Sequence, residues 1–121
     1  MTESTMSPSR HRQPRNDLAF CFPCQPLNSF AWDASAAAGC PEAEAMFALA
    51  SRRLQDPGLA PSTRLQVVTY TSATAYAALL MCHGAVPAIN LPHSMGLYAA
   101  LVAAGACEFE PMLQYVIEAG R

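Results

Sequence analysis

The sequence has little charge, and it lacks the features that mark nucleic-acid-binding or membrane proteins. Only 13% of its 121 residues are charged, the formal net charge is -2 and the pI is near 5.8. Nucleic-acid-binding proteins need a basic face, and none is present beyond the N-terminal arm. Gly84, Pro87 and Asn90 interrupt the most apolar region before it reaches the roughly 18 residues of a membrane span. We therefore expect a cytoplasmic protein without nucleic-acid or membrane partners.

The first seventeen residues also lack the apolar block that a secretory signal needs. Arg10, Arg12 and Arg15 stand there among Ser, Thr and Pro. Transit peptides are similarly rich in Arg and Ser, but this segment has no amphipathic apolar stripe and two prolines interrupt it. We expect residues 1–17 to be a disordered arm and residues 18–121 to form one folded unit.

The five cysteines do not follow the pattern of a disulfide framework or a metal site. Their odd number, without a secretory signal, favours reduced thiols. Cys21 and Cys24 have the CxxC spacing of a zinc or redox half-site, but no second ligand pair has comparable spacing. A redox pair usually opens a helix, whereas this one ends an apolar strand. We therefore expect buried structural thiols and no metal.

Apolar residues are abundant, at 52% of the chain, and their pattern predicts two strands and four helices. The run 18–22, stopped by Pro23, is typical of a strand covered on both faces, and 87–91 is the second strand. Helices are predicted over 41–54, from Ser62–Thr63 to Gly84, from Met95 to Gly105, and over 109–119. Thr63 and Gln66 have capping-box spacing.

This order of elements predicts an α/β layered fold, with parallel strands joined by right-handed crossovers. Two strands do not complete a parallel sheet, because such a sheet needs neighbours and cover on both faces. We expect the chain to be the front portion of a larger fold or one half of a pair.

Ser94 stands at the junction of the second strand and the third helix, in the sequence PHSMG. A nucleophile elbow has this arrangement, with small residues two positions before and after the serine. Gly96 satisfies the position after it, whereas Pro92 is bulkier than the expected glycine. The N–H of Met95 would be free to stabilise an oxyanion, because it opens the helix. The alternative is an ordinary polar residue where a strand meets a helix.

From Leu18 to Arg121 the chain resembles the malonyl-CoA:acyl-carrier-protein transacylase family and the acyltransferase domains of polyketide synthases. Three segments carry the resemblance in order: LAFCFPCQ (18–25), STRLQVVTYTSATAYAALL (62–80) and HSMGLYAALVAAGACEFEPMLQYVIEAGR (93–121). They are similar, respectively, to the family's opening strand and F-P-G-Q-G turn, to its buried helix with a Gln near the start, and to its G-H-S-x-G-E-Y-x-A-L-x-x-A-G segment. The last match is the most specific, since it is dense over nearly thirty residues.

The resemblance implies an incomplete α/β-hydrolase-like fold and an acyltransferase. Ser94 would take an acyl group from coenzyme A and pass it to the phosphopantetheine thiol of an acyl carrier protein. Gln25 would lie beside the oxyanion hole, with the Met95 N–H as second donor. His93 matches the family's histidine before the serine, either as a base or, because a sequence neighbour points away, as a structural residue. Acyl-coenzyme A would be a substrate, and no other cofactor is implied.

The chain departs from the family pattern at several positions. Cys24, Pro26 and Pro92 replace glycines, and Leu97 replaces the usual Glu. Tight turns use glycine for positive φ or close approach.

Two further departures concern the acyl group and the base. Ala119 stands where the family has the arginine that pairs with a malonyl carboxylate, and Arg121 lies roughly 200° further round the helix. We therefore expect uncharged acyl groups. The family's base is a histidine that would lie past residue 121, so the chain alone should be inactive. His83 is the only other histidine within the folded unit.

Within the acyltransferase hypothesis, the carrier-loading subunit of malonate decarboxylase is a close rival to fatty-acid or polyketide carrier loading. An alternative from another class is a non-catalytic remnant or subunit that binds a carrier protein or a partner chain. A thiol or zinc protein built on Cys21 and Cys24 is the third hypothesis.

Overall fold

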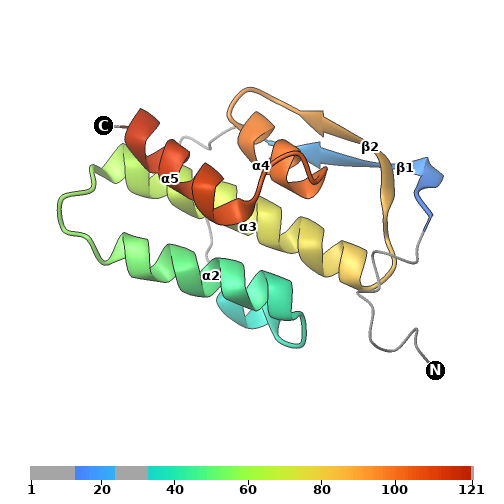
Figure 1. The fold of residues 1–121 in the computed structure, drawn as a ribbon, viewed down its shortest axis with the longest axis horizontal. Helices are drawn as coiled ribbons and strands as arrows, with labels where there is room; N and C mark the ends of the chain where they lie inside the picture. Colours follow the sequence, from blue (N-terminus) through green and yellow to red (C-terminus); the bar gives the residue numbers. More distant parts are fainter. Residues whose placement is uncertain (1–12, 24–32, 121) are drawn as a thin grey trace.

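The computed structural model describes residues 13–23 and 33–120 (Figure 1). Within this part, the chain forms a mixed α/β fold with a two-stranded parallel sheet and four α-helices. The elements in order are β1 (Arg15–Phe22), the short 3-10 helix η2 (Ala34–Ala37), α2 (Pro41–Leu54), α3 (Pro61–Cys82), β2 (Pro87–Pro92), α4 (Gly96–Ala103) and α5 (Phe109–Ala119). This order and the parallel pairing confirm the predicted α/β class.

Strand β1 begins at Arg15, earlier than the predicted start at Leu18. The Arg15 N–H donates to the carbonyl of Val86 over 2.9 Å, and the Arg15 side chain forms an exposed ion pair with Asp17 at 3.0 Å. This ion pair lowers the pKa of the Asp17 carboxyl. The end of the predicted arm is therefore part of the sheet, while residues 1–12 lie outside the described part of the chain.

The two faces of the sheet differ in burial, so the expectation of cover on both faces is wrong for this chain. Phe20 and Phe22 are buried against the helices, whereas the alternate residues of β1 are exposed. The register pairs Cys21 with Leu91, and Leu91 and Ile89 of β2 are 47% and 54% exposed. All four described α-helices lie to one side of the two strands (Figure 1), so within residues 13–23 and 33–120 no helix covers the other face, which we call the bare face.

Helices α2 and α3 pack against each other along most of their length (Figure 1). Pro41 occupies the first turn of α2 as predicted, where its missing N–H is not needed. Helix α3 starts at Pro61, and Thr63 does not cap it. The buried Thr63 hydroxyl instead donates to the carbonyl of Gly120 at 3.0 Å, so the capping-box prediction is wrong. Because Pro61 opens the helix, Thr63 already lies inside the first turn.

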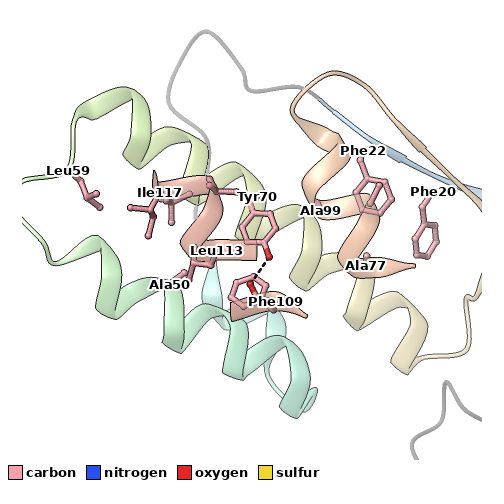
Figure 2. Packing of buried hydrophobic residues seen from close by; sticks show 13 residues of the cluster. Phe20, Phe22, Ala50, Leu59, Tyr70, Ala77, Ala99, Phe109, Leu113 and Ile117 are labelled. Carbon is pink, nitrogen blue, oxygen red and sulfur yellow. Dashed lines mark hydrogen bonds between the residues drawn. The ribbon is translucent and has the colours of Figure 1, made fainter. Parts of the chain in front are cut away.

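The main hydrophobic core lies between α3, α5 and the helix-facing side of the sheet, and Tyr70 is near its centre (Figure 2). The Tyr70 ring stacks on Phe109 at 5.0 Å between ring centroids, and its hydroxyl donates to the Phe109 carbonyl at 2.8 Å. Burial, and secondarily the Cys107 thiol, raise the pKa of Tyr70. The apolar stripe predicted for 109–119 is confirmed, with Leu113 and Ile117 each 1% exposed.

Helix α3 is long and apolar enough to cross a membrane by length and composition, although sequence analysis predicts no membrane span. Half of its apolar window is buried against other elements of the fold. Burial of that kind is typical of the central helix of a water-soluble domain.

The cysteines do not all follow the expectation of buried thiols. Cys40 is buried, but Cys82 and Cys107 are only half-buried and Cys21 is exposed on the bare face of the sheet. Cys24 lies outside the described residues, so the CxxC pair is not described as a unit.

Candidate active site

Ser94 occupies a tight turn between β2, which ends at Pro92, and α4, which begins at Gly96. It is exposed, and its φ is 52°. Among the described residues it is the single non-glycine with positive φ, a conformation that is uncommon for residues with a Cβ. A strained exposed serine between a strand and a helix is the geometry of a nucleophile elbow.

Gly96 is required by close packing against the end of β1. A Cβ at this position would lie 2.3 Å from the carbonyl oxygen of Phe22 and 2.9 Å from that of Pro23. Both neighbours are backbone atoms, which cannot rotate away as a side chain can. The glycine two residues after Ser94 therefore allows α4 to start directly against β1, which is the role that an elbow gives to this position.

Backbone hydrogen bonds hold the turn in place. The His93 N–H donates to the Phe22 carbonyl at 2.9 Å, and the Gly96 N–H donates to the His93 carbonyl at 3.0 Å. The Leu97 N–H donates to the Ser94 carbonyl at 3.1 Å. These bonds tie the elbow to the end of β1, so Ser94 is carried by the rigid sheet.

Met95 is the N-terminal cap of α4 and begins the turn of helix that follows Ser94. Within the described part of the chain, no acceptor bonds its N–H. A free N–H at a helix N-terminus is a hydrogen-bond donor for an anion. Met95 therefore has the local geometry expected of an oxyanion-hole donor.

Pro92 fits the turn without the glycine that the elbow pattern favours. It is the last residue of β2 and pairs with Phe22 in the sheet register. It is also exposed, so its ring meets no closely packed neighbour. Proline is tolerated at such a strand end because no backbone N–H is needed there.

The two described histidines differ in position. His93 is exposed, and its backbone N–H and carbonyl take part in the hydrogen bonds of the turn. His83 caps the C-terminal end of α3, and the six residues of β2 separate that end of the sheet from Ser94. Six strand residues span roughly 20 Å. His83 is therefore beyond hydrogen-bond reach of Ser94 and cannot act as its base.

A small hollow of about 10 Å³ lies beside the elbow and is lined by Met95, Gly96, Tyr98 and Gln66, among others. Gln66 comes from α3, one turn after Thr63, and is half-buried. Sequence analysis considers Gln66 as a partner in a capping box and as the match to the Gln near the start of the family's buried helix. Its position beside the elbow follows from the packing of α3 against α4, which no local pattern indicates.

The remaining predicted residues either lie elsewhere or are outside the described part of the chain. Outside the described part lie Cys24, Gln25, Pro26 and Arg121. The contact of Gln25 with Ser94 therefore stays a prediction. Ala119 is exposed near the end of α5. No group of three His, Cys, Asp or Glu side chains within 13–23 and 33–120 could hold a metal ion.

Comparison with known proteins gives no match to a family model, a curated protein or a solved structure.

Proposed function

We propose that this chain carries the nucleophile elbow of an acyltransferase that moves an acyl group from coenzyme A to the thiol of an acyl carrier protein. The observation that supports it is the turn itself: an exposed serine at φ 52°, followed by a glycine with no room for a Cβ. We infer the reaction from the resemblance of residues 18–121 to the malonyl-CoA:acyl-carrier-protein transacylase family. The two strands and their helices are then the front part of an α/β-hydrolase-like fold in a cytoplasmic enzyme.

In the proposed reaction, the Ser94 Oγ attacks the thioester carbonyl carbon and transfers its proton to a base. The N–H of Met95 donates to the oxyanion that forms, together with Gln25. The C–S bond breaks and coenzyme A leaves as the thiol after protonation. The carrier thiol then attacks the acyl-serine ester, its sulfur takes the acyl group, and Ser94 regains its proton.

The base must come from outside the described part of the chain, because His83 is too distant and His93 adjoins the nucleophile in sequence. A serine hydroxyl without a base is a poor nucleophile at neutral pH. We expect residues 1–121 alone to show no turnover, and a partner chain or further sequence to complete the site.

The acyl group should be uncharged. The family's arginine position is the exposed Ala119, which has no charge to pair with a malonyl carboxylate. Desolvating a carboxylate without a cationic partner is costly. In a completed enzyme, competition between acetyl- and malonyl-coenzyme A should favour acetyl, and a strong malonyl preference would contradict this point.

The elbow can be tested without the base by the substitution Ser94→Cys. A thiol ionises far more readily than a hydroxyl, and a helix N-terminus lowers its pKa further. Incubated with acetyl-coenzyme A, S94C should acquire an acetyl group at position 94, located by peptide mass spectrometry. The exposed Cys21 on β1 is the control thiol within the same molecule.

We expect acetylation at position 94 to be at least ten times faster than at Cys21, while the wild-type chain remains unmodified at Ser94. Equal rates at the two thiols would overturn the proposed elbow. They would favour the second candidate, a non-catalytic remnant or subunit that binds a carrier protein or partner chain. The absence of a base within reach among the described residues supports that alternative.

The carrier-loading subunit of malonate decarboxylase is a variant of the first proposal. It would use the same elbow and the same thioester chemistry. A preference for the malonate-decarboxylase carrier over the fatty-acid or polyketide carrier would identify it.

A further inference from the structure

We propose that the free edge of β1 and the groove beside it form the interface of a symmetric dimer, in which β1 of a second copy extends the sheet. The inference is independent of the chemistry at Ser94. It rests on the backbone of β1, the groove between β1 and α3, and the charges along the strand.

The backbone of β1 presents unpaired groups on the side away from β2. The Phe22 carbonyl accepts from His93, so the N–H and C=O of Phe22 face β2. Backbone groups alternate along a strand, so those of Cys21 and Ala19 face away from β2. Within the described residues no partner is found for them. A row of such groups is a template for another strand.

A groove of about 300 Å³ runs along this same edge. Its lining includes the consecutive residues 19–23, which can share one cavity only along the edge of a strand. The opposite wall is a stripe of α3 that includes Ala73, Ala77 and Leu80. Leu80 is 48% exposed, although it belongs to the most buried helix of the fold. The groove is therefore an apolar surface beside backbone groups that have no partner among residues 13–23 and 33–120.

A second copy fits both features. When two identical strands pair antiparallel, a two-fold axis perpendicular to the sheet relates them, and each outward N–H meets a carbonyl of the other copy. The same axis puts both copies of α3 on one face of the enlarged sheet. The stripe containing Ala73, Ala77 and Leu80 then faces its counterpart, and the small alanines allow the helices to approach closely.

The charges along β1 are compatible with this pairing. Residues 18–22 carry no charge, so no like charges oppose one another over the apolar part of the edge. Arg15 and Asp17 are exposed, opposite in sign and already paired, so the N-terminal half of the strand is neutral. Edge strands that avoid association usually carry unpaired charges, and β1 has none in its apolar half.

The test is the mass of the wild-type chain in solution, measured by analytical ultracentrifugation over a concentration series. A dimer should have twice the 12.9 kDa of the chain. Leu80→Lys places a charge in the groove, and Cys21→Pro removes an outward N–H at a position where proline is tolerated. Each variant should raise the dissociation constant of the dimer at least tenfold.

Two controls match these variants. Leu97 on α4 is 45% exposed, nearly as much as Leu80, so Leu97→Lys adds the same charge away from the groove. Cys21→Ala keeps the outward N–H at the same position, so it separates the loss of this N–H in Cys21→Pro from the loss of the thiol. Both controls should dimerise like the wild type. Circular dichroism of every variant confirms that the fold is retained.

A monomeric wild-type chain at every concentration would overturn the proposal, as would L80K and C21P that dimerise as tightly as L97K and C21A. A mass that grows without limit would show open-ended strand pairing instead of a closed dimer.

Discussion

The helical layer and the sheet of this molecule are built from similarly apolar sequence but differ sharply in burial. In α5, Leu113 and Ile117 are each 1% exposed, whereas Ile89 and Leu91 of β2 are 54% and 47% exposed. An amphipathic helix can bury its single apolar stripe against one neighbour. A parallel sheet needs cover on both faces and neighbours at both edges, which two strands and one layer of helices do not provide. Within the described chain, the helices therefore bury their apolar stripes, whereas the sheet leaves apolar side chains of one face exposed.

The largest expected effect compares two leucines, one from each layer. Leu113→Ala should lower the free energy of unfolding by about 3 kcal/mol, because it removes buried methyl groups and leaves a cavity. Leu91→Ala should lower it by less than about 1 kcal/mol, because nearly half of that side chain is already in water. Urea denaturation of both variants at one protein concentration measures the difference, and equal losses would show that the bare face is covered in solution.

The second comparison concerns two glycines. Gly96→Ala should destabilise the fold by about 3 kcal/mol, because its Cβ would overlap the backbone at the end of β1. At Gly58 a Cβ would meet only the flexible side chain of Asp56, at 3.2 Å, so Gly58→Ala should change stability by less than about 0.5 kcal/mol. If thermal unfolding gave similar midpoints for the two variants, the close packing of the elbow would be wrong.

The Tyr70 hydroxyl offers a smaller test, within the helical layer. Tyr70→Phe should cost about 1 to 2 kcal/mol, since the buried carbonyl of Phe109 loses its donor. Burial raises the pKa of Tyr70 above its ordinary value of 10.0, so below pH 10 the hydroxyl is neutral in both the folded and the unfolded chain.

Above pH 10 the unfolded tyrosine ionises before the folded one does, so this stabilisation is lost as the pH rises. The wild type should therefore lose more stability than Y70F between pH 9 and pH 11. Parallel losses in urea titrations at the two pH values would contradict the burial effect on Tyr70.

The smallest expected effect distinguishes a tertiary hydrogen bond from a helix cap. Thr63→Val should cost about 1 kcal/mol, because the Gly120 carbonyl loses the hydroxyl donor that ties α3 to the end of α5. Ser62→Ala, at the exposed neighbouring position, should change the unfolding free energy by less than about 0.5 kcal/mol. A comparable loss in S62A would indicate that the start of α3 depends on local capping after all.

The sequence predicts the elements well because their signals are local. The stripe of Phe109, Leu113 and Ile117 and the proline at the start of α2 specify helices through periodicity and backbone chemistry. The junction at Ser94 is equally local, since a strand, a serine and Gly96 follow one another within a few residues. These features depend on neighbours in the chain, which the sequence displays directly.

Tertiary structure alone decided the features that depend on residues distant in the chain. Thr63 bonds Gly120, Gln66 lies beside the elbow, and His83 is excluded as a base because α3 ends at the far side of the sheet. The exposure of one face of the sheet also depends on tertiary structure. The sequence of an apolar strand is the same whether or not a second layer covers that face. Local pattern determines which elements form, whereas the free energy of packing determines which of their residues meet.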